Sequence, residues 1–355
     1  MSIVFRLAVV SVVWACMFPL LAENVTTTED MTAQGDWTVT VTAGETNTVT
    51  GVQTGAGKIV KQGAGTLVLA AANTFSGGIS LEEGYLHVQA SGALGSGEIT
   101  ILGQREGYAG PCELWFAGSN MDLGEPAIHV TGNTSCQYPA LCLYGTNNTF
   151  SGTITADHSL YFKDEFQWLY DAIKKEKGSA KWSVDVYKNA SADFRGAITV
   201  AETFHHVPDT DCHFYGPVKA ATFDTVKQLN EYRSHDESDQ TFYGNIHFHA
   251  ANQFDVFNYG YRSVYFESDQ GLDGAHVTAN VPGVTYPRPG TLYLCGHPST
   301  IAGLDVPRVK SDDWTADRGS VSSQTGGLPA TLTITGTVAN ATCKCGLRLL
   351  SALSV

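Results

Sequence analysis

The sequence predicts an all-β protein in which short strands stack as successive turns of one solenoid. The first observation is a series of short alternating segments between residues 57 and 101, each with its apolar residues on one face of a strand. The second is the glycine-rich sequence between these segments, which leaves no room for helices. The third is a pattern, Phe-x-Gly-x-Ile, that recurs along the chain. Strands this short cannot bury one face alone, and stacked turns provide the missing partner.

Composition agrees with an exported solenoid. The chain has 355 residues, which is long for one compact domain but ordinary for a fold that grows by adding turns. Its net charge is −14 and its isoelectric point is about 5.1. An acidic surface argues against nucleic acid or an anionic membrane as the main partner.

Residues 1–22 have the layout of a signal peptide and are expected to be removed. Arg6 gives the positive start, the apolar stretch runs from Leu7 to Leu21, and Ala22 is a small residue at a plausible cleavage point. The apolar stretch is short for a membrane span, which needs ~20 residues. We therefore expect export to the cell surface or the extracellular space, with no transmembrane span in the mature chain.

The first complete repeat unit, residues 57–101, carries a resemblance to a known family. Its segments are Lys61-Gln-Gly-Ala-Gly-Thr-Leu-Val-Leu69, Asn73-Thr-Phe-Ser-Gly-Gly78 and Gly84-Tyr-Leu-His-Val88. They resemble the autotransporter-associated β-strand repeat of bacterial passenger proteins, except that Ala70-Ala-Ala72 stands where a glycine usually precedes the Asn-Thr-aromatic step. The resemblance implies a right-handed parallel β-helix at the cell surface and no particular chemistry. Its structural positions here are Gly63, Gly65, Leu67 and Leu69.

The Phe-x-Gly-x-Ile pattern extends this architecture beyond the first unit. We expect its phenylalanines and isoleucines to point inward on stacked ladders, and its glycines to allow a tight corner between strands. The four copies are Phe75, Gly77 and Ile79; Phe150, Gly152 and Ile154; Phe194, Gly196 and Ile198; and Phe242, Gly244 and Ile246.

The resulting domain plan has four parts and two insertions. After the signal peptide, residues 23–56 form an N-terminal cap with the first strands, residues 57–342 form the passenger-like β-helix, and residues 343–355 form an irregular tail. Helical spacing of apolar residues predicts one short insertion at 164–178 and a weaker one at 222–233.

Two aromatic residues of the first insertion, Trp168 and Tyr170, are candidates for surface recognition of an unknown glycan or protein. Excursions from a regular scaffold are where binding residues tend to lie. The alternative is that these rings seal the helix onto the coil, and we favour it for Tyr170.

No catalytic, cofactor-binding or metal-binding residue is predicted. His247 and His249 lie two apart on a strand, a spacing that suits a metal, but no cysteine or carboxylate pattern nearby supports a site. The alternatives to a structural, adhesin-like role are a polysaccharide-acting enzyme and a truncated fragment of a larger autotransporter. Gly296-His297 and Arg308-Val-Lys310 resemble parts of polygalacturonase motifs, but no upstream carboxylate pair is arranged for inverting hydrolysis.

Overall fold

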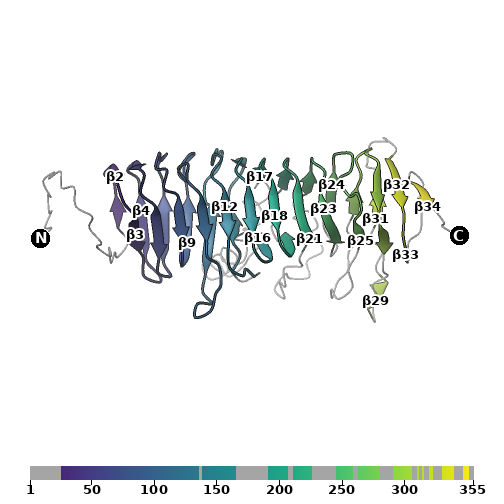
Figure 1. The fold of residues 1–355 in the computed structure, drawn as a ribbon, viewed down its shortest axis with the longest axis horizontal. Coiled ribbons are helices and arrows are strands. Elements are labelled where there is room, and N and C mark those ends of the chain that lie inside the picture. The colour runs from purple at the N-terminus through teal and green to yellow at the C-terminus, as the bar shows by residue number, and fades with distance from the viewer. Residues whose placement is uncertain are drawn as a thin grey trace, which may run out of the picture.

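Parallel strands stacked along one axis form an elongated rod (Figure 1). The computed structural model describes residues 25–135, 138–164, 191–206, 211–225, 245–258, 263–279, 291–305, 310–311, 314–315, 320–322, 330–339 and 347–351, and no helix occurs within these ranges. Sequence order follows position along the rod, from purple N-terminal strands to yellow C-terminal ones. The predicted all-β parallel β-helix is confirmed.

The strands form three faces along the rod. The first face is a parallel ladder of β3 (Trp37–Thr40), β6 (Ile59–Gln62), β8 (Ile79–Leu81), β10 (Ile99–Ile101), β12 (Ile128–Val130), β15 (Ile154–Ala156) and β18 (Ile198–Val200). The second face is β1 (Thr26–Thr27), β4 (Thr46–Val49), β7 (Thr66–Leu69), β9 (Gly84–Val88), β11 (Cys112–Phe116), β13 (Leu141–Leu143), β16 (Leu160–Asp164) and β19 (Thr203–His206).

The third face has its ladder of strands in the later coils, from Asn148 onward. Its main ladder is β14 (Asn148–Phe150), β17 (Ser191–Phe194), β20 (Asp211–Phe214), β22 (Ile246–Phe248), β24 (Ser263–Phe266), β26 (Thr291–Tyr293) and β31 (Ser320–Ser322). The strands β2 (Met31–Ala33) and β5 (Gln53–Gly55) pair separately near the N-terminal end.

Beyond β19 the first two faces merge, because the long strand β21 (Val218–Asp224) pairs with both β18 and β19. The ladder then continues through β23 (Gln253–Asn258), β25 (His276–Ala279), β28 (Gly303–Asp305) and β33 (Val338–Ala339). A further parallel ladder joins β27 (Ser299–Ile301), β32 (Ala330–Ile334) and β34 (Leu347–Ser351), and β29 (Lys310–Ser311) pairs antiparallel with β30 (Trp314–Thr315).

The core consists of inward side chains that stack on their counterparts in the next coil. On the first face Ile59 pairs with Ile79 and Ile79 with Ile99, so one coil of the clear repeat takes 20 residues. The ladder continues through Ile128, Ile154 and Ile198 to Val218, and every member is at most 3% exposed. Repetition at this spacing buries apolar side chains that a single coil would leave in water.

On the third face the inward ladder is aromatic. Phe194 stacks on Phe214 with ring centroids 5.3 Å apart, Phe214 on Phe248 at 5.2 Å, and Phe248 on Phe266 at 5.4 Å. All four rings are at most 1% exposed. Offset stacks of this kind stabilise a core beyond the area that they bury.

A stack of glycines marks the corner between the third and first faces. A Cβ atom on Gly196 would lie 2.0 Å from the carbonyl oxygen of Gly152, and one on Gly216 would lie 2.2 Å from that of Gly196. A Cβ atom on Gly152 would lie 2.0 Å from the oxygen of Pro126. None of these three glycines has a positive φ angle. Glycine is required here because the backbone of the neighbouring coil leaves no space for a Cβ atom.

One charged residue is inside the core of the clear repeat. Lys61 occupies an inward position between Val39 and Leu81, and its side chain is fully buried. Its Nζ donates hydrogen bonds to the carbonyl oxygens of Gln62 (3.0 Å), Gly63 (2.6 Å) and Glu83 (2.9 Å). Burial lowers the pKa of this ammonium to about 8, and the three carbonyls supply the partners that a buried charge needs.

Three predicted elements differ from the structure. Thr222–Asp224, expected to begin the second helical insertion at 222–233, belong to β21, because Phe223 continues the inward ladder between Phe204 and Val256. Of the first insertion, 164–178, Asp164 ends β16, and the other residues lie outside the described ranges, as do residues 226–233. Part of the tail predicted as irregular, 343–355, is the strand β34, which pairs with β32.

A prediction concerns the glycine corner. Gly196→Ala should lower the free energy of unfolding by about 2–3 kcal/mol, because the added Cβ atom meets backbone that has no room to move. Gly35→Ala is the matched control, since a Cβ atom there meets nothing within 4 Å, and we expect a change within about 0.5 kcal/mol. Urea unfolding of both variants checks this, and equal stabilities would contradict the close contact at the corner.

Candidate functional surface

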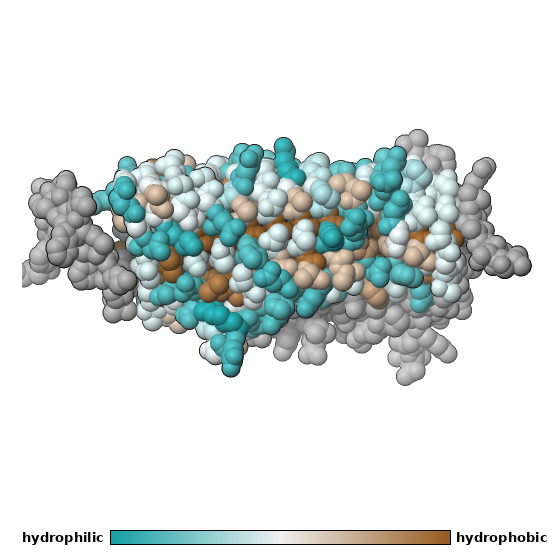
Figure 2. All heavy atoms as spheres, viewed as in Figure 1, coloured by the Kyte–Doolittle hydropathy of each residue, from teal (hydrophilic) through white to brown (hydrophobic). Residues whose placement is uncertain are grey.

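Because the interior of the described coils is filled by side chains, binding residues must lie outside it, at outward strand positions or in the segments between strands. On the first face these positions carry small or flexible side chains, such as Ser80, Thr100, Thr155 and Thr199. Figure 2 shows a largely polar surface on the side that it displays, with apolar residues visible as a broken band along the rod. Aromatic and titratable groups concentrate instead on parts of the second and third faces.

The first concentration is on the second face, at β9 and β11. Alternation along β11 places Glu113 and Trp115 outward, opposite Tyr85 and His87 of β9. All five residues of β11 are nevertheless buried, with Glu113 5% and Trp115 8% exposed. The His87 ring stacks on Trp115 with centroids 4.9 Å apart, and Tyr85 packs edge-on against Trp115 at 6.2 Å.

Glu113 is the chemically unusual group of this cluster. Its Oε2 accepts hydrogen bonds from the Trp115 indole Nε1 at 2.9 Å and from the Cys142 thiol at 3.4 Å. Burial raises the pKa of Glu113 to about 7 and lowers the pKa of His87 to about 4. Near neutral pH the carboxyl group therefore holds a proton in a large fraction of molecules, which is the state of a potential proton donor.

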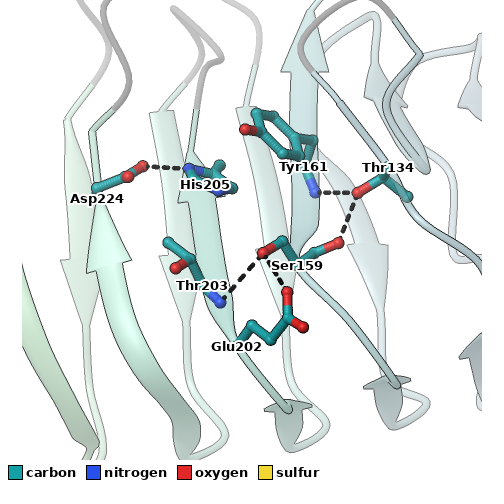
Figure 3. Close-up of polar contacts among 7 residues, drawn as sticks. All are labelled: Thr134, Ser159, Tyr161, Glu202, Thr203, His205 and Asp224. Carbon is teal, nitrogen blue, oxygen red and sulfur yellow. Dashed lines mark hydrogen bonds and ion pairs between the residues drawn. The ribbon is translucent and has the colours of Figure 1, made fainter.

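A second polar group lies further along the same face, on β16, β19 and β21 (Figure 3). The Tyr161 ring stacks on His205 with centroids 3.9 Å apart, and His205 Nδ1 lies 2.7 Å from Asp224 Oδ1. These two side chains are only 15% and 11% exposed, so the ion pair is well shielded. The carboxylate fixes the imidazole with Nδ1 as the donor, an arrangement that orients a histidine.

The rest of Figure 3 is a hydrogen-bond chain between neighbouring coils. Thr134 Oγ1 donates to the Ser159 carbonyl oxygen at 2.7 Å and accepts from the Tyr161 amide at 3.1 Å. Ser159 Oγ lies 3.0 Å from Glu202 Oε2, whereas His158 contacts the other Glu202 oxygen at 3.5 Å. The carboxylate thus lies between serine and histidine, so this arrangement is not a catalytic triad.

The third concentration is an outward ring ladder on the third face. His213, His247, Tyr265 and Tyr293 occupy one register position in β20, β22, β24 and β26. Their rings stack in that order with centroids 4.4, 4.4 and 4.6 Å apart. Because each ring covers the face of the next, the ladder presents mainly ring edges to solvent.

Beside this ladder, His249 and Tyr215 form a second stacked pair, with centroids 4.3 Å apart. Tyr215 is 44% exposed and has the guanidinium of Arg195 above its ring at 5.8 Å. Glu267 contacts His247 Nδ1 at 2.8 Å and His249 Nδ1 at 3.0 Å. Within the described residues, no group of three or more His, Cys, Asp or Glu side chains has the arrangement to hold a metal ion.

The structure places most of the predicted repeat residues in the core. Leu67, Leu69, Phe75, Ile79, Phe150, Ile154, Phe194 and Ile198 are at most 1% exposed. Gly63 and Gly65 lie at the corner between β6 and β7, and Gly77 packs against the backbone of Gly57. Trp168, Tyr170, Phe242 and Gly244 lie outside the described residues.

The fourth copy of the Phe-x-Gly-x-Ile pattern differs from its predicted register. Ile246 pairs with Cys212 on the third face, so it is not the counterpart of Ile198 on the first. Phe248, which follows it, stacks on Phe214 and takes the phenylalanine position of that coil. A copy absent from the sequence analysis is Phe214-Tyr-Gly-Pro-Val218, in which valine replaces isoleucine.

Sequence reasoning identified His247 and His249 but not their carboxylate partner. Glu267 belongs to another coil, and spacing within one strand does not reveal it. Glu113 was missed because alternation places it on the solvent side, where a carboxylate is ordinary.

A prediction follows for Glu113. Its pKa is raised in the folded state, so the folded protein binds more protons than the unfolded chain between about pH 4.5 and 7. The stability that this carboxyl group contributes should therefore fall by about 2 kcal/mol as the pH rises from 5 to 8. Glu113→Gln keeps the shape without titrating, so the difference in unfolding free energy between the two proteins isolates the effect. A difference that stays constant with pH would contradict it.

Comparison with known protein families supports the repeat in the N-terminal part of the rod. Residues 59–88 match the family model of the passenger-associated-transport-repeat. A search of curated proteins and a search of solved structures found no match. The matched segment runs from β6 to β9, two first-face and two second-face strands of successive coils, and includes the buried Lys61. The chain therefore contains a repeat of the kind found in autotransporter passenger proteins, as its sequence resemblance indicates.

Proposed function

We propose that this protein is an exported, surface-associated passenger-type protein with a structural, adhesin-like role and no catalytic activity. The observation that carries the proposal is the passenger-associated-transport-repeat within a long parallel β-helix. A continuous apolar core along the described coils supports the structural part, because a filled interior suits a rigid extension rather than an enclosed substrate site.

Export is supported by the same repeat and by the composition of residues 1–22. Across the described part of the chain, no helix has the length and apolar character needed to cross a bilayer. We propose that the signal peptide directs the chain out of the cytoplasm and that the mature protein acts at the cell surface or outside it.

In this proposal, the residues that recognise the ligand lie in a segment inserted between the coils and not on the flat faces of the rod. The ring ladder is a poor platform for sugars, because both faces of the Tyr265 ring are covered, by His247 and by Tyr293. A sugar stacks on an open aromatic face, which the Tyr265 ring does not offer. We therefore assign recognition of a glycan or protein to the insertion at 164–178, with Trp168 as its principal aromatic residue.

The test compares single substitutions in a glycan array and a surface-adhesion assay. Trp168→Ala should weaken binding about tenfold or more, as expected for an aromatic anchor. Tyr170→Ala should have a smaller effect, because we expect that ring to pack against the coil. Tyr215→Ala is the control, since it removes the exposed aromatic residue of the described surface. Equal binding by all variants would exclude this insertion as the recognition element.

A polysaccharide-acting enzyme is the second candidate, and Glu113 is the observation that favours it. A carboxyl group with a pKa of about 7 suits a general acid. Glycoside hydrolysis usually needs a second carboxylate across the scissile bond, and the described partners of Glu113 are Trp115 and Cys142. Turnover of a polysaccharide by the intact chain, lost in Glu113→Gln, would overturn the proposed non-enzymatic role.

A further inference from the structure

Three histidines and one glutamate meet on the outer side of the third face. We call His213, His247, His249 and Glu267 the histidine cluster; they come from three successive coils. His213 Nδ1 lies 3.0 Å from His249 Nε2. Glu267 contacts the other two histidines. Its Oε1 lies 2.8 Å from His247 Nδ1, and its Oε2 lies 3.0 Å from His249 Nδ1.

These contacts fix where the protons are when all three imidazoles are neutral. An ionised carboxylate only accepts hydrogen bonds, so His247 and His249 must both carry hydrogen on Nδ1. Neutral His249 then has an unprotonated Nε2, which accepts a hydrogen bond from His213. His213 must therefore donate through Nδ1. Every contact in the cluster is satisfied in this single arrangement.

Protonation disturbs the three histidines unequally. A proton added at Nε2 of His213 or of His247 leaves all three contacts in place. A proton added at Nε2 of His249 removes the only acceptor for His213, so two N–H groups would face each other at 3.0 Å. His213 and His247 also stack with centroids 4.4 Å apart, so charging both places like charges in contact.

The surrounding groups do not neutralise three imidazolium ions. In the preceding coil, Asp193 lies opposite His213 in register and partly offsets the lowering of the His213 pKa by burial, although its carboxylate is also 3.6 Å from the Arg195 guanidinium. Asp211 accepts a hydrogen bond from the Asn245 amide at 2.6 Å. The other side chains beside the cluster are uncharged near neutral pH, because burial raises the pKa of each: Tyr215, Tyr265 and Cys295. Glu267 is therefore the one carboxylate in direct contact with these imidazoles among the described residues.

We propose that the histidine cluster is an acid-sensitive switch that holds β20, β22 and β24 together at neutral pH and releases them when His249 becomes protonated. We expect the release to be local. On the first face of the N-terminal repeat, Ser80 and Thr100 occupy the outward positions, so no group of imidazoles holds those strands together. This inference is independent of the proposed adhesin-like role.

The direction of the pH effect agrees with the electrostatics of the folded protein. Burial, followed by the neighbouring His247, lowers the pKa of His213, and burial lowers the pKa of His249 despite Glu267. Histidines with a lowered pKa bind protons more readily in the unfolded or opened chain. Stability is therefore present above the ordinary histidine pKa and is lost as the pH falls below it.

Hydrogen exchange measured by mass spectrometry on the full chain tests the switch, at pH 7.5 and 5.0 with intrinsic rates corrected. Protection of amides in 212–214, 246–249 and 264–267 should fall about tenfold or more at pH 5.0. Protection in 59–62, 79–81 and 99–101 should change by less than about twofold. Equal changes in both groups, or no change in the cluster, would overturn the proposal.

Two variants should move the response in opposite directions. His213→Phe keeps the ring stack on His247 but removes one charge and the contact with His249, so most of the acid response should disappear. Glu267→Gln removes the carboxylate that stabilises a charged His249 in the closed state, so protons favour the opened chain more strongly and opening should begin at higher pH. His129→Phe is the control, because His129 pairs with Asp157 on the first face and should leave the response unchanged. A wild-type response in Glu267→Gln, or its shift to lower pH, would contradict the switch even if His213→Phe does not fold.

Discussion

Close passage of backbone over backbone at each corner is the constraint on which the rest of this structure depends. Where the third face turns into the first, Gly152, Gly196 and Gly216 leave no space for a Cβ atom between successive coils. That approach sets the register in which Ile154 meets Ile198 and Phe194 meets Phe214. With the register fixed, every inward side chain stacks on a counterpart, and long segments between coils leave the core unchanged.

In such a core the inward residues determine the fold, and the outward residues remain available for function. Inward positions repeat from coil to coil, whereas outward positions differ along the rod: small side chains on the first face, the Glu113 cluster on the second, and the stacked histidines and tyrosines on the third. The pKa of Glu113 and the contacts of His249 both arise from outward residues that are largely enclosed by neighbours from other coils. The solenoid therefore creates chemically distinct environments by bringing together residues that are far apart in sequence.

The sequence predicts the parts of this fold that one coil contains. Glycine spacing and alternation identify the repeat unit at 57–101, and three copies of the Phe-x-Gly-x-Ile pattern have their phenylalanine and isoleucine in the core as predicted. The fourth is shifted because Phe248 has no glycine after it and so does not match the pattern, although its ring fits the aromatic ladder. Phe223 was assigned to a helix because its three-residue spacing to Val226 is helical and does not match the two-residue alternation of a strand, but its pairing with Phe204 of the preceding coil places it in a strand. Contacts between coils, such as that of Glu267 with His249, depend on segment lengths that no local pattern specifies.

Distances along one face give the most direct test of the stacked-coil account. Thr38 and Lys219 are linked on the first face through the successive partners Val60, Ser80, Thr100, His129, Thr155 and Thr199. At ~4.8 Å per step, spin labels at Thr38 and Thr155 should be about 24 Å apart, and labels at Thr38 and Lys219 about 34 Å apart. Pulsed electron paramagnetic resonance, with labels attached through non-canonical amino acids, measures both. A separation that increases by about 10 Å between the two pairs is the expected result. A second distance equal to or shorter than the first would contradict parallel stacking.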